Sequence, residues 1–413
     1  MLTVAENELL VRVGPGTSGG ALMRRYWHPV LKASVLEAGG EPLHVRLLGE
    51  DFVAFRSPDG ELGFIEEGCP HRRVSMSLAR NEACGLRCIF HGWVVGRDGA
   101  VVEAPSEPAE RGNFAAKVRT RRFHVREAAG LVWVFIGDGE PAPFPAFPFT
   151  ALPVDHIDVA EVPGACNWAQ LLEGQIDSAH ISHLHASSAT ISTNPLTAAA
   201  LTDKAPHFEV RNTPWGFHVG AVRTLPDGRY YTRVTEFVMP YYQGIAPAVP
   251  PETELYDTIP RFIVCQVPLD DEHTTVWYIM WKPSAPIVRG EVGAMWEIWN
   301  QEYQAVRGRH KMGQDRARMR AGHFTGINNL LTEDMVVAEG AGPIADRSRE
   351  TLGSSDTAVA RFRRQYLEAI RDHAEGRLPR GLDADTPFAL IEGRGVFHRE
   401  ADAWRDALAP ELV

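Results

Sequence analysis

The chain has 413 residues, of which 44% are hydrophobic and 23% are charged. This composition argues against wholesale disorder, and the length predicts two domains. The formal net charge of −11 argues against nucleic-acid binding, because that function needs a basic surface. There is no basic stretch joined to an apolar run near the N-terminus, and the longest apolar run, residues 131–136, is far too short to span a membrane. We therefore expect a cytoplasmic protein without a membrane segment.

Three regions are predicted over the first 150 residues. Residues 1–40 are expected to form a helical lead-in, with a helix from about Gly19 to Tyr26. Residues 41–140 alternate short apolar stretches with Asp-Gly and similar turn signals, which predicts a small all-β domain of hairpins. Residues 141–150 contain four prolines and are expected to be a semi-rigid linker.

Residues 151–413 form the second predicted domain. Long strands are expected over 208–238 and 262–281, with turns at Asp227-Gly228 and at residues 270–272. Helices are expected at 167–184, 294–308, 327–338 and 357–373. Strands followed by helices that pack on them predict an α+β fold.

The five cysteines are an odd number, so a disulfide framework is not expected. Cys69 and His71 are followed by Cys88 and His91, and each half of this pattern offers one thiolate and one imidazole. A zinc finger groups like ligands together, and a plant-type ferredoxin uses four cysteines. A Rieske centre replaces two cysteines on one iron by two histidines. The spacing predicts a Rieske 2Fe-2S cluster, with Cys84 as a free cysteine.

Metal-ligand residues also gather further along the chain. Asp177 and His180 are three residues apart and would share one face of a helix. His183 fits a straight helix with His180, whereas His185 can join His180 only if the helix ends or bulges between them. Helical geometry alone leaves His183 and His185 nearly equal as second ligands.

A carboxylate would complete this second site. Two histidines and one carboxylate form the facial triad of non-haem Fe(II) oxygenases, which leaves coordination positions open for O2. Glu333 and Asp334, on the predicted helix 327–338, are the best candidates. Without a metal, the histidines would simply form a polar helix end, but an upstream cluster needs an acceptor for its electrons.

These motifs resemble the alpha subunits of Rieske non-haem iron oxygenases, most closely the phthalate dioxygenase-like branch, which includes aromatic O-demethylases. The resemblance covers nearly the whole chain and rests on residues 12–17, 23–27, 45–50, 69–72, 86–88, 91–93, 105–108, 167–185, 342–347 and 352–356. It implies an all-β Rieske domain joined to a helix-grip (START-like) catalytic domain with an antiparallel sheet and helices.

The resemblance also implies residue roles. The family pattern Asp-x2-His-x4-His makes His180 and His185 the iron ligands, and Asp334 matches the carboxylate ligand. Relatives usually carry Gln-Asp where this chain has Glu333 and Asp334, which leaves Glu333 as a rival ligand. Asp177 matches a bridging carboxylate between an iron-ligating histidine and a cluster histidine of the neighbouring subunit.

The implied cofactors are one Rieske 2Fe-2S cluster and one mononuclear Fe(II) per subunit. The implied partners are a separate flavin- and iron–sulfur-containing reductase or a ferredoxin, which delivers electrons from NAD(P)H. The resemblance further implies a head-to-tail homotrimer or a stacked hexamer, and a small aromatic substrate together with O2.

We expect an oxygenase that cis-dihydroxylates a phthalate-like aromatic acid, with O-demethylation of a methoxylated aromatic acid as the alternative. The alternative that is not an enzyme is a Rieske-type electron-transfer protein, which would need only the first site. Relatives that act on aromatic acids hold the carboxylate with arginine, whose fork matches that group. Arg223 and Arg233 are the candidates here, with Arg211 as a third, although a surface salt bridge is the commoner role for each.

Overall fold

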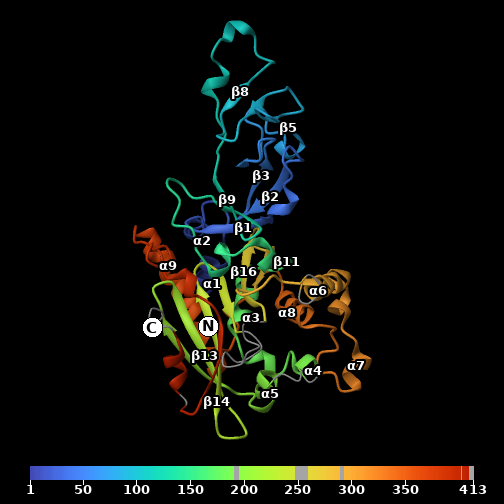
Figure 1. Cartoon of the computed structure of the whole chain (residues 1–413), viewed down its shortest axis with the longest axis vertical. Coiled ribbons are helices and arrows are strands. Elements are labelled where there is room, and N and C mark those ends of the chain that lie inside the picture. The colour runs from blue at the N-terminus through green and yellow to red at the C-terminus, as the bar shows by residue number, and fades with distance from the viewer. Residues whose placement is uncertain (190–194, 247–258, 289–292, 401, 409–413) are drawn as a thin grey trace. The chain divides into compact units, whose positions relative to one another are not determined.

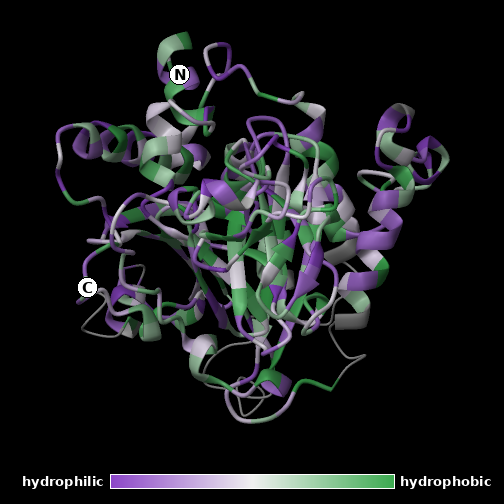
Figure 2. Cartoon of the chain, turned by 90° about the horizontal axis from the view of Figure 1, so that it is seen from above, coloured by the Kyte–Doolittle hydropathy of each residue, from purple (hydrophilic) through white to green (hydrophobic). Residues whose placement is uncertain are grey.

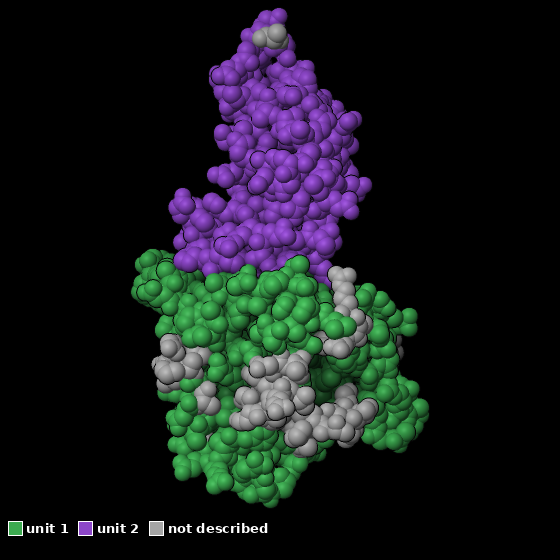
Figure 3. Space-filling model, in the orientation of Figure 1, with its two compact units in different colours: residues 1–12, 145–413 green, residues 13–144 purple. Residues whose placement is uncertain are grey.

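The computed structural model describes the chain except for residues 190–194, 247–258, 289–292, 401 and 409–413. The chain divides into two compact units. One contains residues 13–144, and the other contains residues 1–12 together with residues 145–413 (Figure 3). Each unit has its own sheets and its own hydrophobic core.

The smaller unit is built from three antiparallel sheets, preceded by the short helix α2 (Ser18–Met23). Their strand orders are β1-β10-β9, β2-β3-β4 and β5-β6-β7-β8. The bounds are β1 (Trp27–Lys32), β2 (Leu43–Leu47), β3 (Glu50–Arg56), β4 (Leu62–Glu66), β5 (Arg80–Glu82), β6 (Gly85–Arg87), β7 (Val94–Val95), β8 (Val101–Glu103), β9 (His124–Ala128) and β10 (Leu131–Phe135). The all-β character expected from the Asp-Gly turns is therefore present.

Apolar side chains from neighbouring strands of this unit pack into hydrophobic clusters. The rings of Phe52 and Phe64 stack with centroids 5.1 Å apart, and Phe123 meets Phe52 edge-on at 5.0 Å, geometries that aromatic pairs prefer. A second cluster includes Val53, Ile65, Met76 and Leu86 together with Cys69 and Cys88. The two cysteines are thus anchored in the core, although they lie in loops.

An antiparallel sheet dominates the larger unit (Figure 1). Its strand order is β11-β17-β16-β15-β14-β13-β12, and β18 pairs with β14. The bounds are β11 (Ile157–Gly164), β12 (His207–Asn212), β13 (Gly216–Thr224), β14 (Tyr230–Val238), β15 (Tyr242–Ile245), β16 (Arg261–Pro268), β17 (Thr274–Trp281) and β18 (Arg394–His398). Every residue of β17 is buried, and Figure 2 shows hydrophobic colour on strands near the middle of the view.

Helices lie around this sheet (Figure 1). They are α1 (Val4–Val11), α3 (Trp168–Ile176), α4 (Ala186–Ala189), α5 (Pro195–Thr202), α6 (Gly293–Val306), α7 (Arg316–Arg320), α8 (Leu330–Gly340) and α9 (Thr357–Ala374). Leu171 of α3 and Met335 of α8 join Val264 and Val276 of the sheet in one hydrophobic cluster. This packing fixes α3 and α8 on the same face of the sheet.

Two side chains near the start of α3 hold that helix in place. Asn167 caps the helix by accepting from the backbone of Ala169, and its amide donates to the carbonyl oxygens of Val11 and Asp271 at 3.0 and 2.7 Å. Gln170 donates to the carbonyl oxygen of Ala338, at the end of α8, at 2.8 Å. The relative position of α3 and α8 is therefore fixed by hydrogen bonds as well as by packing.

The α+β fold expected from the sequence is confirmed, and some element boundaries differ. The predicted helix 167–184 ends at Ile176, because Asp177 adopts an extended conformation. Residues 208–238 contain the turn expected at Asp227-Gly228, between β13 and β14, and a second turn that was not expected, between β12 and β13. The boundary between the units falls after residue 144, and residues 1–12 and 13–40 belong to different units, unlike the single lead-in expected over residues 1–40.

Candidate metal centres

Two loops of the smaller unit repeat one backbone pattern. The N–H of Cys69 donates to the carbonyl oxygen of Val74, and the carbonyl oxygen of Cys69 accepts from Arg73. In the same way, the N–H of Cys88 donates to the carbonyl oxygen of Trp93, and the carbonyl oxygen of Cys88 accepts from the N–H of Gly92. All four hydrogen bonds are between 2.8 and 3.0 Å long. Arg73 and Gly92 both have positive φ angles of 60° and 75°, which tight loops require. The two halves of the motif therefore form matching loops.

The four ligand candidates lie together at these loops. Cys69 and Cys88 are buried. Burial raises the pKa of the Cys69 thiol, and the neighbouring Cys88 thiol raises it further. The rings of His71 and His91 have centroids 4.6 Å apart, and Nδ1 of His91 is buried without a hydrogen-bond partner. Paired thiols and paired imidazoles fit a cluster with two sulfur and two nitrogen ligands.

Cys84 lies apart from these loops. It is exposed, in the turn between β5 and β6, and its nearest polar contact is Oε1 of Glu103 at 4.0 Å. This position agrees with the expectation of a free cysteine.

The second site begins where α3 ends. Oδ1 of Asp177 accepts from the backbone N–H of Ala179 at 2.7 Å, a local turn that competes with helix continuation. A short 3-10 turn, His180–Ser182, follows, and His183 has a non-helical backbone. This break turns His180 and His185 toward one another, with ring centroids 5.0 Å apart.

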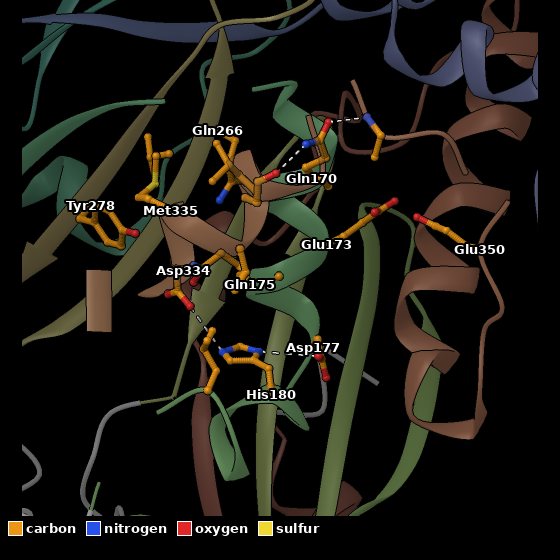
Figure 4. A pocket seen from close by; sticks show the side chains of 18 residues that line it. Gln170, Glu173, Gln175, Asp177, His180, Gln266, Tyr278, Asp334, Met335 and Glu350 are labelled. Carbon is orange, nitrogen blue, oxygen red and sulfur yellow. Dashed lines mark hydrogen bonds and ion pairs between the residues drawn. The ribbon is translucent and has the colours of Figure 1, made fainter. Parts of the chain in front are cut away.

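Asp334 of α8 completes a group with these two histidines. Ligand atoms of His180, His185 and Asp334 all lie within 4.8 Å of one another. Oδ1 of Asp334 is 3.1 Å from Nε2 of His185 and 3.8 Å from Nε2 of His180. Figure 4 shows His180 between Asp334 and Asp177. Two imidazoles and one carboxylate around one point fit the facial triad of mononuclear iron.

Two rival ligands are placed elsewhere. His183 is exposed, and its ring lies 5.9 Å from that of Phe324. Glu333 is fully buried and turns to the far side of the His185 ring, where its Oε2 lies 2.8 Å from Nδ1. Neither residue contributes to the group of three.

Opposite charges in this site favour their ionised forms. Burial opposes ionisation of Asp334, but His185, His180 and the side chain of Gln175 hold the pKa of this carboxyl below its ordinary value. Burial also works against protonation of His185, yet Asp334 and Glu333 raise the pKa of His185 to about 9. The two carboxylates on either side of His185 thus favour positive charge at this site.

A cavity of about 240 Å³ opens beside these groups, between α3, α8 and the sheet (Figure 4). Asp177, His180 and Asp334 line it, together with Gln175 and apolar side chains such as Leu171, Val276 and Met335. His180 and Asp334 can thus be reached from this cavity by a small molecule.

The three candidate arginines have different surroundings. Arg223 of β13 is 1% exposed and is engaged, since it donates to the hydroxyl and the carbonyl oxygen of Ser178 at 3.2 and 2.7 Å. Arg233 of β14 is half-buried on the same face of the sheet, because it pairs with Ala221, two residues from Arg223. Arg211 pairs with His218 and therefore lies on the opposite face.

Arg233 makes no hydrogen bond or ion pair with any residue that the structure describes. Burial lowers the pKa of this guanidinium, while Tyr231, Asp177 and Asp334 act in the opposite direction. A half-buried cation without a partner is costly, so this side of the sheet suits an anionic ligand.

Comparisons with known proteins identify the families to which the two parts of the chain are similar. Residues 26–122 match the Rieske 2Fe-2S domain family, and residues 134–411 match the family described as LigXa C-terminal domain like. The oxygenase subunit of phthalate 4,5-dioxygenase from Pseudomonas putida is 38% identical, over 98% of this chain and 94% of that protein. The oxygenase subunit of 5,5'-dehydrodivanillate O-demethylase from a Sphingobium species is 28% identical, over 97% of this chain and 88% of that protein.

A solved structure shows the same fold. The terminal oxygenase of carbazole 1,9a-dioxygenase from Nocardioides aromaticivorans IC177 has a TM-score of 0.59 and 20% identity, covering 89% of this chain and 97% of that one.

The fold and the two sites define an iron-dependent oxygenase that combines a Rieske domain with a helix-grip domain. The chain belongs to the Rieske non-haem iron oxygenase alpha subunits, in the phthalate dioxygenase-like branch with the LigXa-type C-terminal domain. It is the terminal oxygenase component of a multicomponent system, and its cofactors are a Rieske 2Fe-2S cluster and a mononuclear iron. These findings exclude the alternative of a simple electron-transfer protein. Within the described residues, every helix is too short or too polar to cross a bilayer.

Proposed function

We propose that this oxygenase acts on an aromatic carboxylate and uses the ligand sets expected from its motifs. Cys69, His71, Cys88 and His91 would hold the cluster within a Rieske domain at about residues 41–140. His180, His185 and Asp334 would hold the iron in a catalytic domain at 151–413. The observation that carries the proposal is the convergence of His180, His185 and Asp334, whose ligand atoms lie within 4.8 Å of one another.

When bound, the iron supplies the centre at which O2 is activated, and the cluster supplies electrons. Asp177 has two tasks in this scheme. Its Oδ2 lies 3.7 Å from Nδ1 of His180, so a small movement would let it accept a hydrogen bond from that ring. It also faces the cavity, where it is available to a cluster histidine of a neighbouring subunit. Burial opposes ionisation, but His180 and backbone N–H groups hold the pKa of Asp177 below its ordinary value, so the side chain is an acceptor at neutral pH.

Arg233 would bind the substrate carboxylate. It lacks a partner among the described residues and is close enough to Asp177 and Asp334 for their charges to affect its pKa. If the guanidinium of Arg233 held the substrate carboxylate, the aromatic ring would stay beside the iron. Holding reactants in the correct geometry accelerates a reaction. Arg223 instead holds Ser178, the residue after Asp177, and is proposed to keep this turn in shape.

The proposed reaction is cis-dihydroxylation of a phthalate-like acid, as the name of the Pseudomonas relative suggests. O-demethylation of a methoxylated aromatic acid is the second candidate, because the Sphingobium relative is named for that reaction. Both reactions use the same metal ligands, so the product decides between them.

The proposed assembly is a homotrimer or a stacked pair of trimers, in which the cluster of one subunit serves the iron of the next. The electron donor would be a separate flavin- and iron–sulfur-containing reductase, or a ferredoxin, that uses NAD(P)H. Capture of a ferredoxin is consistent with the carbazole dioxygenase oxygenase, which has been solved in complex with its ferredoxin.

The test uses the purified holoprotein with a reductase of this class and NADH. Aromatic acids with one or two carboxylates, with and without methoxy groups, are screened by O2 uptake. A cis-diol identifies dioxygenation, and formaldehyde identifies O-demethylation. Uptake only with uncharged aromatics would refute the proposed carboxylate substrate.

A further inference from the structure

The outer nitrogens of the two histidines are held in different ways. Nδ1 of His185 lies 2.8 Å from Oε2 of Glu333, and both side chains are buried. Nδ1 of His180 is 3.7 Å from Asp177, which is longer than a hydrogen bond, and it has no hydrogen-bond partner. One ring is therefore fixed in its orientation and the other is adjustable.

Both oxygens of Glu333 are used. Oε1 accepts from the hydroxyl of Thr325 at 2.5 Å, and Oε2 faces the His185 ring. The side chain has no exposed surface. A buried carboxylate is costly unless it is hydrogen-bonded and lies close to a positive charge, and His185 with a bound metal ion would provide that charge.

We infer that Glu333 is a positioning residue for the iron, which orients His185 and places a second negative charge behind it. Because Oε2 accepts a hydrogen bond from Nδ1–H of His185, the lone pair on Nε2 would be free to bind a metal ion beside Asp334. A carboxylate behind a ligating histidine also raises the basicity of that ligand. Asp334 and Glu333 together balance the two positive charges of a ferrous ion. This inference rests on the proposed role of His185 as an iron ligand.

A purely structural role predicts different behaviour. In that case Glu333 would only link α8 to Thr325, and its loss would lower stability without changing metal affinity. Glu339 provides a matched comparison, because it lies on the same helix, is 9% exposed, and accepts from the backbone of Ala165 at 2.8 Å and from the hydroxyl of Tyr303. It makes no contact with the group of three.

The experiment compares Glu333→Gln with Glu339→Gln in the full-length, cluster-containing protein. Glutamine keeps the size and an acceptor oxygen for Nδ1 of His185 but removes the charge. The apparent dissociation constant for Fe(II) is measured anaerobically by competition with a ferrous chelator. The visible spectrum of the cluster and the unfolding temperature report on folding, and the EPR spectrum of the ferrous–nitric oxide adduct reports on the ligand field.

Glu333→Gln is expected to bind Fe(II) roughly 10- to 100-fold more weakly, the usual cost of losing an outer partner of a metal ligand. The nitric oxide adduct should change, and the cluster spectrum should not. Glu339→Gln should keep wild-type affinity. Equal affinity in Glu333→Gln and wild type, or an equal loss in both variants, would overturn the inference.

A third variant guards against a folding failure. If Glu333→Gln loses the cluster spectrum, Glu333→Asp decides, because it keeps the charge but shortens the side chain and withdraws the acceptor from Nδ1 of His185. Weaker Fe(II) binding in Glu333→Asp supports the inference, and unchanged binding overturns it. A wild-type protein that binds no Fe(II) at all would instead refute the proposed function, which keeps the two failures distinct.

Discussion

Nε2 of His185 lies 3.1 Å from Oδ1 of Asp334, a contact that joins the turn after α3 to the first half of α8. His180 approaches the same carboxylate oxygen at 3.8 Å. The carboxylate of Asp334 therefore lies within 4 Å of a ring nitrogen of each histidine. The Nε2 atoms of His180 and His185 and Oδ1 of Asp334 could all bind one metal ion with little rearrangement of the backbone.

Replacing His180 should remove the mononuclear iron and spare the cluster. His180→Ala deletes one of three ligands, and two remaining ligands hold iron poorly. Iron and acid-labile sulfide per chain are measured, and iron is expected to fall by about one-third, since two of the three irons belong to the cluster. His183→Ala, at the exposed neighbour, should retain the full complement. Full iron in His180→Ala would remove this residue from the ligand set.

Replacing His71 should change the cluster and not the mononuclear site. In His71→Cys a thiolate replaces a neutral imidazole, which adds negative charge to the cluster. The reduction potential should then fall toward the roughly −400 mV of all-cysteine clusters, with a changed visible spectrum. Cys84→Ser is the control, because that exposed thiol lies outside the loops. An unaltered spectrum and potential in His71→Cys would contradict the assignment.

Asp177→Asn should uncouple the two metal centres. The amide keeps the size of the side chain, so both metals should remain bound. Turnover should fall by roughly 10- to 100-fold, as expected for outer partners of metal ligands. Single-turnover oxidation of the reduced cluster isolates the electron-transfer step. Asp346→Asn, an exposed carboxylate paired with Ser348, is the control, and wild-type cluster oxidation in Asp177→Asn would rule out the bridging role.

The ligand types and their spacing were readable from the sequence, because Cys-x-His and Cys-x2-His are local patterns. The choice between His183 and His185 needed the family pattern, although one local signal was present: an aspartate followed by serine favours a turn closed by its own side chain, and Asp177 makes such a turn. The contacts of Glu333 with His185 and of Arg223 with Ser178 were not predictable. Each joins segments far apart in the chain, and such contacts leave no periodicity in a single sequence.

Arg233→Gln should weaken recognition of the carboxylate. Hydrogen bonds to charged groups contribute about 1.5–3 kcal/mol, so KM should rise by roughly 10- to 100-fold, while the cluster spectrum stays the same. The preference for an aromatic acid over its methyl ester should also shrink. Arg211→Gln, on the opposite face of the sheet, should leave KM unchanged. If Arg233→Gln kept the full preference for the acid, Arg233 would not be the residue that binds the substrate carboxylate.

Glu173→Gln should destabilise the larger unit in a pH-dependent way. Glu173 of α3 accepts from Arg347 at 2.9 Å and from Arg363 at 2.8 Å, and both arginine side chains are almost fully buried. Removing one member of a buried ion pair leaves uncompensated charge and costs about 3–5 kcal/mol. The unfolding midpoint in denaturant at pH 7 should therefore fall clearly, while Glu375→Gln, whose partner Arg377 is exposed, should have little effect.

The sign of the pH effect follows from the same pairing. Burial opposes ionisation of Glu173, but Arg347 and Arg363 outweigh it and hold the pKa of Glu173 below its ordinary value. A proton therefore binds less tightly to the folded protein than to the unfolded chain. The stabilisation is present above the ordinary glutamate pKa and is lost as pH falls through the lower folded value. The difference in midpoint between wild type and Glu173→Gln should accordingly narrow on acidification, and a difference that widens would show that the arginines do not hold this carboxylate ionised.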